Sequence, residues 1–201
     1  MTTLILVRHA QSEANVELIA EGGGGNSPLT DEGRQQAERL SMYLEETHAQ
    51  ISHIYSSPQI RAHDTAKAVA LRLTLEIQLD HDLREGMLGT WEGTPPSQER
   101  DWEGLNTDPH YDEHGGESPF QLGRRCGEQI KEIAEQHPAQ TVLVVSHGAA
   151  LSHGLAHVLG TEPISGKQYK HHNTGITLLD WRDHPPELLS VNQRPHLEEI
   201  S

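Results

Sequence analysis

The sequence LILVRHAQSEAN, residues 4–15, places a continuous apolar run directly before an arginine and a histidine. A short apolar run of this kind is typical of a strand that is buried on both faces. The sequence TVLVVSHG, residues 141–148, repeats the arrangement and again reaches a histidine directly after the apolar run. We therefore expect two buried strands, over residues 3–7 and 141–146, each followed closely by a histidine.

Strands and helices are expected to alternate along the chain of 201 residues. This alternation predicts an α/β fold in a single domain, residues 1–201: a three-layer sandwich with a mainly parallel central sheet flanked by helices. Residues 86–118, with little periodicity, are interpreted as a loop-rich insertion over the active site, and no element is predicted after residue 182. The other expected strands are 51–56, 76–79 and 176–181. One helix is expected to run from an N-cap at Thr30 to about His48, and the other expected helices are 60–73, 118–136 and 149–159.

Charged and imidazole side chains follow the expected strands at their carboxyl ends, where α/β sheets bind ligands. Arg8 and His9 follow the first strand, Arg61 starts the helix after the second, Glu85 follows the third, and His147 follows the fourth. Each residue alone is more often a loop or surface residue. Together, however, two guanidiniums facing two imidazoles repel one another unless an anion lies between them. Because arginine binds phosphate through paired donors, the group predicts a phosphate pocket with a nucleophilic imidazole.

Ordered motifs over roughly residues 3–180 resemble those of a known family. The resemblance is to the histidine phosphatase superfamily, in its phosphoglycerate mutase-like branch and of the broad-specificity phosphatase type. The motifs that carry it are LVRHAQSEAN at 6–15, PLTDEGRQQA at 28–37, SSPQIRA at 56–62, LRE at 83–85, GES at 116–118 and VSHG at 145–148.

The resemblance implies a role for each candidate residue. His9 is expected to be the nucleophile that takes the phosphoryl group, and Glu85 to donate a proton to the leaving oxygen. Gly148 stands where the other branch of the superfamily carries an aspartate, which favours Glu85 as the acid. An imidazole attacks only when neutral, so we expect its second nitrogen to donate to a backbone carbonyl. The residues implied to bind the phosphate are Arg8, Asn15, Arg61 and His147.

Ala10 departs from the family pattern, which most often has glycine after the nucleophilic histidine. If this position required positive φ, alanine would cost about 1 kcal/mol. We nevertheless expect an active enzyme.

These residues predict a metal-independent phosphatase that hydrolyses small phosphomonoesters through a phosphohistidine intermediate. A cofactor-dependent phosphoglycerate mutase is the main alternative, although the stretch between Glu85 and His147 is shorter than in mutases of this family. A phosphohistidine or phosphoprotein phosphatase, or a protein that only binds phosphorylated ligands, is a further alternative. We expect no cofactor.

The composition limits the partners and the compartment. Thirty acidic against 15 basic residues give a net charge of −15, so neither nucleic acid nor a membrane is an expected partner. The expected partner is a small phosphorylated metabolite, and a homodimer is left open. A lone cysteine, no apolar run long enough to span a membrane and no secretory signal favour the cytoplasm.

Histidines and tryptophans outside the motifs suggest two further features. His110, His114, His171 and His172 could suggest a metal site, but such residues are more often at the surface, so no metal is expected. Trp91 and Trp102 could cover a substrate or fill a small core, and we favour the core. No cluster of lysine or arginine lies in residues 86–118, which argues against a strongly polyanionic substrate.

Overall fold

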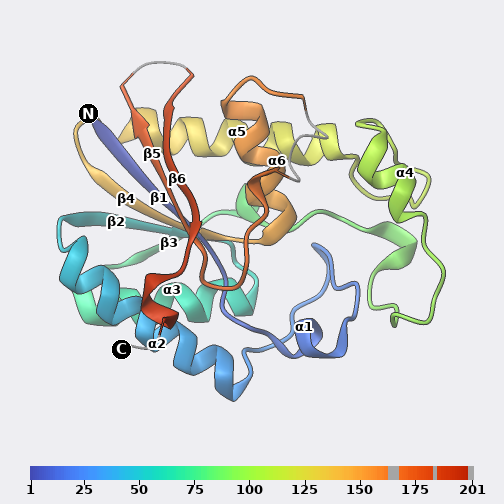
Figure 1. Cartoon of the computed structure of the whole chain (residues 1–201), viewed down its shortest axis with the longest axis horizontal. Coiled ribbons are helices and arrows are strands. Elements are labelled where there is room, and N and C mark those ends of the chain that lie inside the picture. The colour runs from blue at the N-terminus through green and yellow to red at the C-terminus, as the bar shows by residue number, and fades with distance from the viewer. Residues whose placement is uncertain (163–167, 183–184, 199–201) are drawn as a thin grey trace.

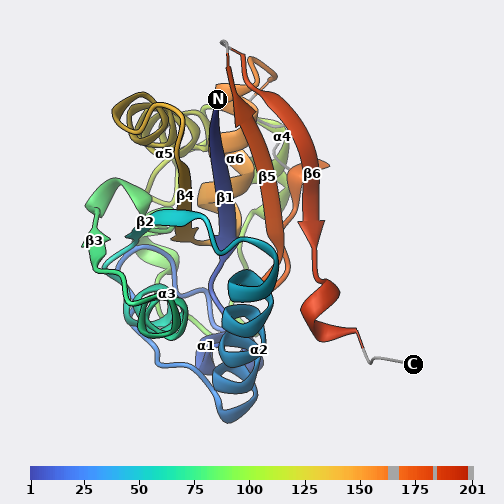
Figure 2. The ribbon, with the colours of Figure 1, turned by 90° about the vertical axis from the view of Figure 1, so that its left-hand side faces the viewer.

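The computed structural model describes residues 1–162, 168–182 and 185–198 and contains a six-stranded sheet between two layers of helices (Figure 1). The strand order is β3-β2-β4-β1-β5-β6, which Figure 2 shows from one end of the sheet to the other. This architecture confirms the expected α/β sandwich. The strands are β1 (Thr2–Arg8), β2 (Ile51–Ser56), β3 (Ile77–Leu79), β4 (Thr141–Ser146), β5 (Ile176–Trp181) and β6 (Glu187–Gln193).

The four strands at one side of the sheet, β3, β2, β4 and β1, pair in parallel. Strand β5 pairs antiparallel with β1, and β6 pairs antiparallel with β5. The sheet is therefore parallel where the predicted site residues lie and antiparallel at the other edge.

Alternate residues of the central strands fill two separate cores, as expected for strands that are covered on both faces. Leu4 and Leu6 of β1 join the core under α5 (Pro119–Gln136) and α6 (Gly148–Val158). Ile5 and Val7 join the core over α2 (Asp31–Thr47) and α3 (Ile60–Leu73). In Figure 1 the first pair of helices lies above the sheet and the second pair below it.

Local sequence signals determine where two of these helices begin. The Thr30 hydroxyl accepts a hydrogen bond from the Gly33 amide at 2.9 Å and caps α2. Ser118 and Gln121 form a capping box at the start of α5. Both caps satisfy amides that have no partner within the helix, and both were predicted.

Three described elements lie outside the predictions: α1 (Glu13–Glu17), α4 (Trp102–Thr107) and strand β6. Both helices are shorter than two turns, so apolar periodicity could not reveal them. Strand β6 is an edge strand whose residues are mostly half-exposed, and its pairing with β5 is irregular. Helices α1 and α4 lie beyond the carboxyl ends of β1 and β4 (Figure 1).

The two ends of the segment 86–118 lie against each other. The Glu117 amide donates to the Met87 carbonyl at 2.8 Å, and the Met87 amide donates to the Glu117 carboxylate at 3.0 Å. Within the segment, Trp91 is buried and packs on the rings of His114 and Trp102, with centroids 4.7 and 5.2 Å apart. Trp91 is thus a core residue, as predicted. The interpretation of residues 86–118 as an insertion over the active site stays a prediction.

Two expectations concern the chain as a whole. Cys126 is buried as a free thiol. Among the described residues, no helix is long and apolar enough to cross a membrane.

Candidate active site

The structure brings the predicted residues together at the carboxyl ends of β1, β2 and β4. A cavity of about 250 Å³ is lined by Arg8, His9, Asn15, Arg61 and Glu85. The sixth residue, the fully buried His147, packs beside His9 with a distance of 5.1 Å between the ring centroids.

The His9 ring is held in one tautomer by the backbone that follows it. Its Nδ1 lies 2.7 Å from the Ala10 carbonyl oxygen, which can only accept, so Nδ1 carries the proton. The lone pair therefore lies on Nε2, as expected for a nucleophile. Ala10 does not have positive φ, and its amide donates to the Thr65 hydroxyl at 2.9 Å. The backbone strain that alanine would cause at a position with positive φ is therefore absent.

Burial and nearby cations keep both imidazoles neutral. Burial is the largest cause that lowers the pKa of His9 well below its usual value, and Arg8 and Arg61 lower it further. The pKa of His147 is also lowered well below its usual value, first by burial and then by Arg61 and His9. Because both rings are neutral, they add no positive charge to that of the two guanidiniums.

The contact with the Ser57 hydroxyl indicates which nitrogen of His147 carries the proton. The Ser57 hydroxyl lies 2.8 Å from His147 Nε2 and accepts from the Gln59 amide at 3.3 Å. Among the described residues, His147 Nε2 is the acceptor within reach of this hydroxyl, so the hydroxyl proton points to Nε2, which leaves the proton of the neutral ring on Nδ1. This Nδ1 is buried and has no partner among the described residues, so it is available to donate to an anion. Sequence reasoning placed Ser57 in a motif but did not give it a role.

Asn15 is oriented by Asn173, which the sequence analysis did not single out as a site residue. The Asn15 Oδ1 accepts from the Asn173 side-chain amide at 3.0 Å and from the Ser12 backbone amide at 3.3 Å. The Asn173 amide also donates to the His9 carbonyl at 3.0 Å. Because its oxygen is occupied, Asn15 presents its NH₂ group as the remaining donor.

The two guanidiniums are fixed by main-chain carbonyls. Arg8 Nη1 donates to the His171 carbonyl at 2.8 Å. Arg61 donates to the carbonyls of Gly22 and Gly25, both at 3.2 Å, and forms an ion pair with Glu21 at 3.0 Å. Glu21 also lines the cavity and was not predicted.

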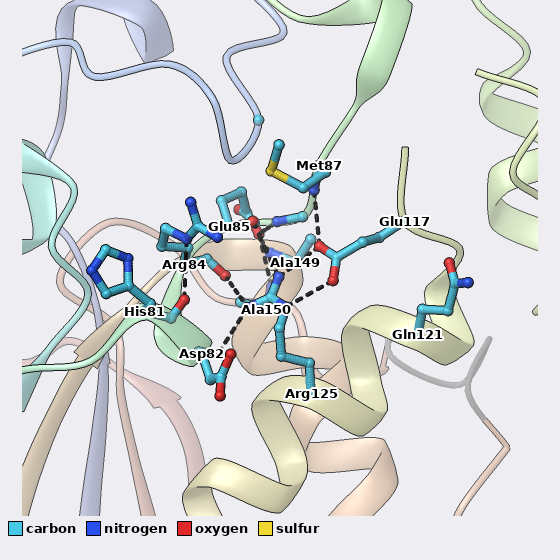
Figure 3. Close-up of polar contacts among 12 residues, drawn as sticks. His81, Asp82, Arg84, Glu85, Met87, Glu117, Gln121, Arg125, Ala149 and Ala150 are labelled. Atoms are coloured by element: carbon cyan, nitrogen blue, oxygen red, sulfur yellow. Dashed lines mark hydrogen bonds and ion pairs between the residues drawn. The ribbon is translucent and has the colours of Figure 1, made fainter. Parts of the chain in front are cut away.

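The Glu85 carboxylate lies at the N-terminus of α6 (Figure 3). Its Oε1 accepts from the Gly86 amide at 3.0 Å and the Ala150 amide at 2.8 Å, and its Oε2 accepts from the Ala149 amide at 3.2 Å. A carboxylate is well placed at the amides that begin a helix. These donors hold the group at the wall of the cavity near His9.

Arg125 and Glu117 support the segment that carries Glu85. Arg125 donates from Nη1 to the carbonyls of Asp82 at 2.8 Å and Arg84 at 3.1 Å, and from Nη2 to that of Glu85 at 3.3 Å. It also pairs with both oxygens of Glu117, at 2.7 and 2.6 Å (Figure 3). The motif residue Glu117 thus acts through Arg125 on the main chain around Glu85.

Two of the considered histidines differ from the expected surface placement. His171 is 1% exposed, and its Nε2 forms a hydrogen bond with the Thr177 hydroxyl at 2.7 Å. His114 is 2% exposed within the aromatic cluster of residues 86–118. Trp102, expected in a core, is 42% exposed and lines the cavity. Within the described part of the chain, no group of three or more metal-ligating side chains is placed to hold an ion.

Comparison with known proteins agrees with this geometry. The model of the histidine phosphatase superfamily (branch 1) matches residues 4–194. The chain belongs to the histidine phosphatase superfamily.

Named relatives resemble the chain over about three quarters of its length or more. Phosphoserine phosphatase 1 of Hydrogenobacter thermophilus is 31% identical over 209 aligned residues, covering 100% of this chain and 96% of the relative. Phosphoglycerate mutase-like protein 4 of Arabidopsis thaliana is 33% identical over 157 residues, or 74% of this chain and 67% of the relative. A phosphoserine phosphatase of Entamoeba histolytica, solved with phosphoserine, superposes with a TM-score of 0.88 at 28% identity, covering 98% of this chain and 100% of that chain.

These relatives identify this histidine phosphatase as a phosphoric monoester hydrolase.

Proposed function

We propose that the protein hydrolyses small phosphomonoesters through a phosphohistidine formed on Nε2 of His9. The observation that carries this proposal is the hydrogen bond of 2.7 Å from His9 Nδ1 to the Ala10 carbonyl, which leaves the Nε2 lone pair free at the cavity. Arg8 and Arg61 line the same cavity, which supports a site where the proposed nucleophile and the proposed phosphate-binding groups act on one ligand.

In the first step the Nε2 lone pair forms a bond to phosphorus while the ester P–O bond breaks. Negative charge on the transferring group spreads over its three other oxygens, which are stabilised by donors already in place. In this proposal the donors are Arg8, Arg61, the Asn15 amide and Nδ1–H of His147. Glu85, in its protonated form, gives its proton to the leaving alkoxide.

In the second step water attacks the phosphohistidine and the P–N bond breaks. The Glu85 carboxylate left by the first step now accepts a proton from that water, so it acts as acid and then as base. His9 returns to its neutral form with the Nδ1 proton still bonded to Ala10, and inorganic phosphate leaves. Dividing the reaction in this way replaces one difficult displacement by two easier ones.

The alcohol of the substrate would lie against a mostly apolar wall. Beyond the phosphate-binding residues, the cavity is lined by Met87 and Leu88 from the segment 86–118 and by Trp102 and Leu105 of α4. Phosphoserine, which is bound to the Entamoeba relative, is one small organic phosphate to test.

The test is a panel of phosphomonoesters, including phosphoserine, sugar phosphates, nucleoside monophosphates and both phosphoglycerates, with a chelator present. We expect release of inorganic phosphate from at least one ester at a rate that the chelator does not change. Interconversion of 2- and 3-phosphoglycerate faster than phosphate release would instead identify a mutase. Activity on phosphoproteins but on no small ester would overturn the proposed substrate class.

A further inference from the structure

A carboxylate, Glu21, lies inside the phosphate-binding end of the cavity. Its Oε2 is 3.0 Å from Arg61 Nη1, and both side chains are nearly buried, at 12% and 3% exposure. A carboxylate paired with Arg61 is unexpected in a phosphate site, because the carboxylate and the phosphate compete for the positive charge of the same arginine. The proposal below rests on the proposed function, since it concerns the same pocket.

Both oxygens of Glu21 already have partners. Oε1 accepts from the Ser27 backbone amide, and Oε2 accepts from the Ser27 hydroxyl at 2.8 Å in addition to Arg61. A role in binding an ammonium group of the substrate is therefore less consistent with its contacts than a role toward Arg61.

The glycine-rich segment beside Glu21 is built around this ion pair. A Cβ on Gly25 would lie 2.0 Å from Cγ of Glu21, so only glycine permits this approach. The carbonyls of Gly22 and Gly25 accept from Arg61, and the same two carbonyls accept from the Gln59 side-chain amide at 3.1 and 2.7 Å. The segment thus presents its carbonyls and one carboxylate to a single guanidinium.

Hydrogen bonds to the two carbonyls use one N–H on each Nη of Arg61, and the Glu21 carboxylate lies against Nη1 as an ion pair. The Nε–H and one Nη2–H remain for a phosphate oxygen. Arg61 is therefore fixed and partly neutralised before any ligand arrives, and it keeps a side of its planar group free for phosphate.

The Glu21 carboxylate offsets part of the positive charge of the site. Arg8 and Arg61 supply two positive charges, and the buried His9 and His147 are neutral. Burial lowers the pKa of Arg61, and Glu21 opposes this shift more strongly than Glu85 does. A phosphate dianion entering this site meets less net positive charge than the two arginines alone would provide.

We propose that Glu21 is a positioning and counter-ion residue that weakens the binding of inorganic phosphate, so that product leaves after each turnover. The carboxylate holds Arg61 in place for the transferring phosphoryl group and opposes retention of the dianion afterwards. Because Glu21 acts through Arg61, its removal strengthens phosphate binding without removing a group that touches the reacting atoms.

The experiment compares Glu21→Gln with Ser27→Ala. The glutamine keeps the shape of the side chain and one of its two acceptor oxygens but removes its charge, whereas the alanine at position 27 removes an anchor of the loop and keeps the charge. Glu17→Gln, at an exposed carboxylate in α1, controls for the change in total charge. The dissociation constant of inorganic phosphate is measured by calorimetry on the resting protein, and KM with the best ester of the panel.

We expect Glu21→Gln to bind phosphate about tenfold more tightly, which is the size expected when one nearby charge is removed from a partly screened site. KM should fall in parallel. Ser27→Ala should bind phosphate no more tightly than the unchanged protein, and Glu17→Gln should bind it equally. The different results expected at positions 21 and 27 separate the effect of charge from the effect of loop anchoring.

Weaker or unchanged phosphate binding in a folded Glu21→Gln protein would overturn this inference, because Glu21 would then act only as a loop anchor. Equal tightening by Ser27→Ala would overturn it as well. If ester hydrolysis persists in either case, the proposed function stands. Absence of both hydrolysis and phosphate binding in the unchanged protein would overturn the proposed function and this inference together.

Discussion

At the scale of single residues, polar neighbours determine which atom of each site residue faces the ligand. The Ala10 carbonyl leaves Nε2 of His9 free, and the Ser57 hydroxyl leaves the proton of His147 on Nδ1. Asn173 occupies the oxygen of Asn15 and leaves its NH₂ group as a donor. A nucleophile and two donors are thus oriented before phosphate binds. Because these groups need not reorient during the reaction, they can stabilise the transferring phosphoryl group with little reorganisation.

Asn173→Ala should raise KM about tenfold with a smaller change in kcat, because Asn15 loses its orientation while His9 keeps its tautomer. Steady-state kinetics with one ester would measure both constants. The double variant Asn15→Ala/Asn173→Ala provides the control, since it should be no worse than Asn15→Ala alone. Additive losses in the double variant would show that Asn173 does not act through Asn15.

At the scale of elements, the ends of β1, β2 and β4 carry the site, and α5 and α6 hold the acid. Glu85 accepts from amides at the start of α6, while Arg125 of α5 bonds the carbonyls of residues 82, 84 and 85. Helices α5 and α6 also share a core. The proposed acid therefore depends on two packed helices rather than on its loop alone.

Glu85→Gln should slow hydrolysis of alkyl phosphates about a hundredfold and of phenyl phosphates much less, because phenoxide leaves without a proton. Arg125→Met should also slow the hydrolysis of alkyl phosphates more than that of phenyl phosphates. The loss of rate should be smaller than for Glu85→Gln, since Arg125→Met displaces the acid without removing it. Arg124→Met, at the exposed neighbouring position of α5, is the matched control and should change neither rate. Equal losses on both classes of ester would count against the acid role.

Long elements and their caps could be predicted from the sequence, and short ones could not. The apolar runs of β1 and β4 and the caps at Thr30 and Ser118 are local signals, and the structure contains each. The short helix α4 is capped by Asp101 but is too short to show an apolar period. The roles of Glu21 and Asn173 have no local signal, because they depend on contacts between residues distant in the chain. Five of the six predicted residues could be placed together because parallel strands end at one edge, whereas Asn15 was predicted from the family resemblance.

At the scale of the whole molecule, the fold buries histidines in their neutral form. Burial is the largest cause that lowers the pKa of His171 and of His196, each to about 4, and that of His9 and His147 well below its usual value. The unfolded chain binds protons at these histidines near pH 6.5, whereas the folded chain does not. The resulting stability is complete above pH 6.5 and is lost as the pH falls toward the folded-state pKa values.

The free energy of unfolding should therefore fall between pH 7 and pH 5, by about 2 kcal/mol from His171 alone. Chemical denaturation at a series of pH values measures this slope. His171→Gln should reduce the slope because it removes the buried ring that must take up a proton, while His81→Gln, at an exposed position, should not. An identical slope in all three proteins would contradict the assignment to buried His171.

Trapping the covalent intermediate tests the central claim most directly. The protein is mixed with a phosphorus-labelled ester and quenched within milliseconds, and the label is mapped by mass spectrometry under alkaline conditions. The account predicts an acid-labile, base-stable phosphoryl group on Nε2 of His9, and none in His9→Ala. Turnover with label on another side chain, or with label on none, would contradict it.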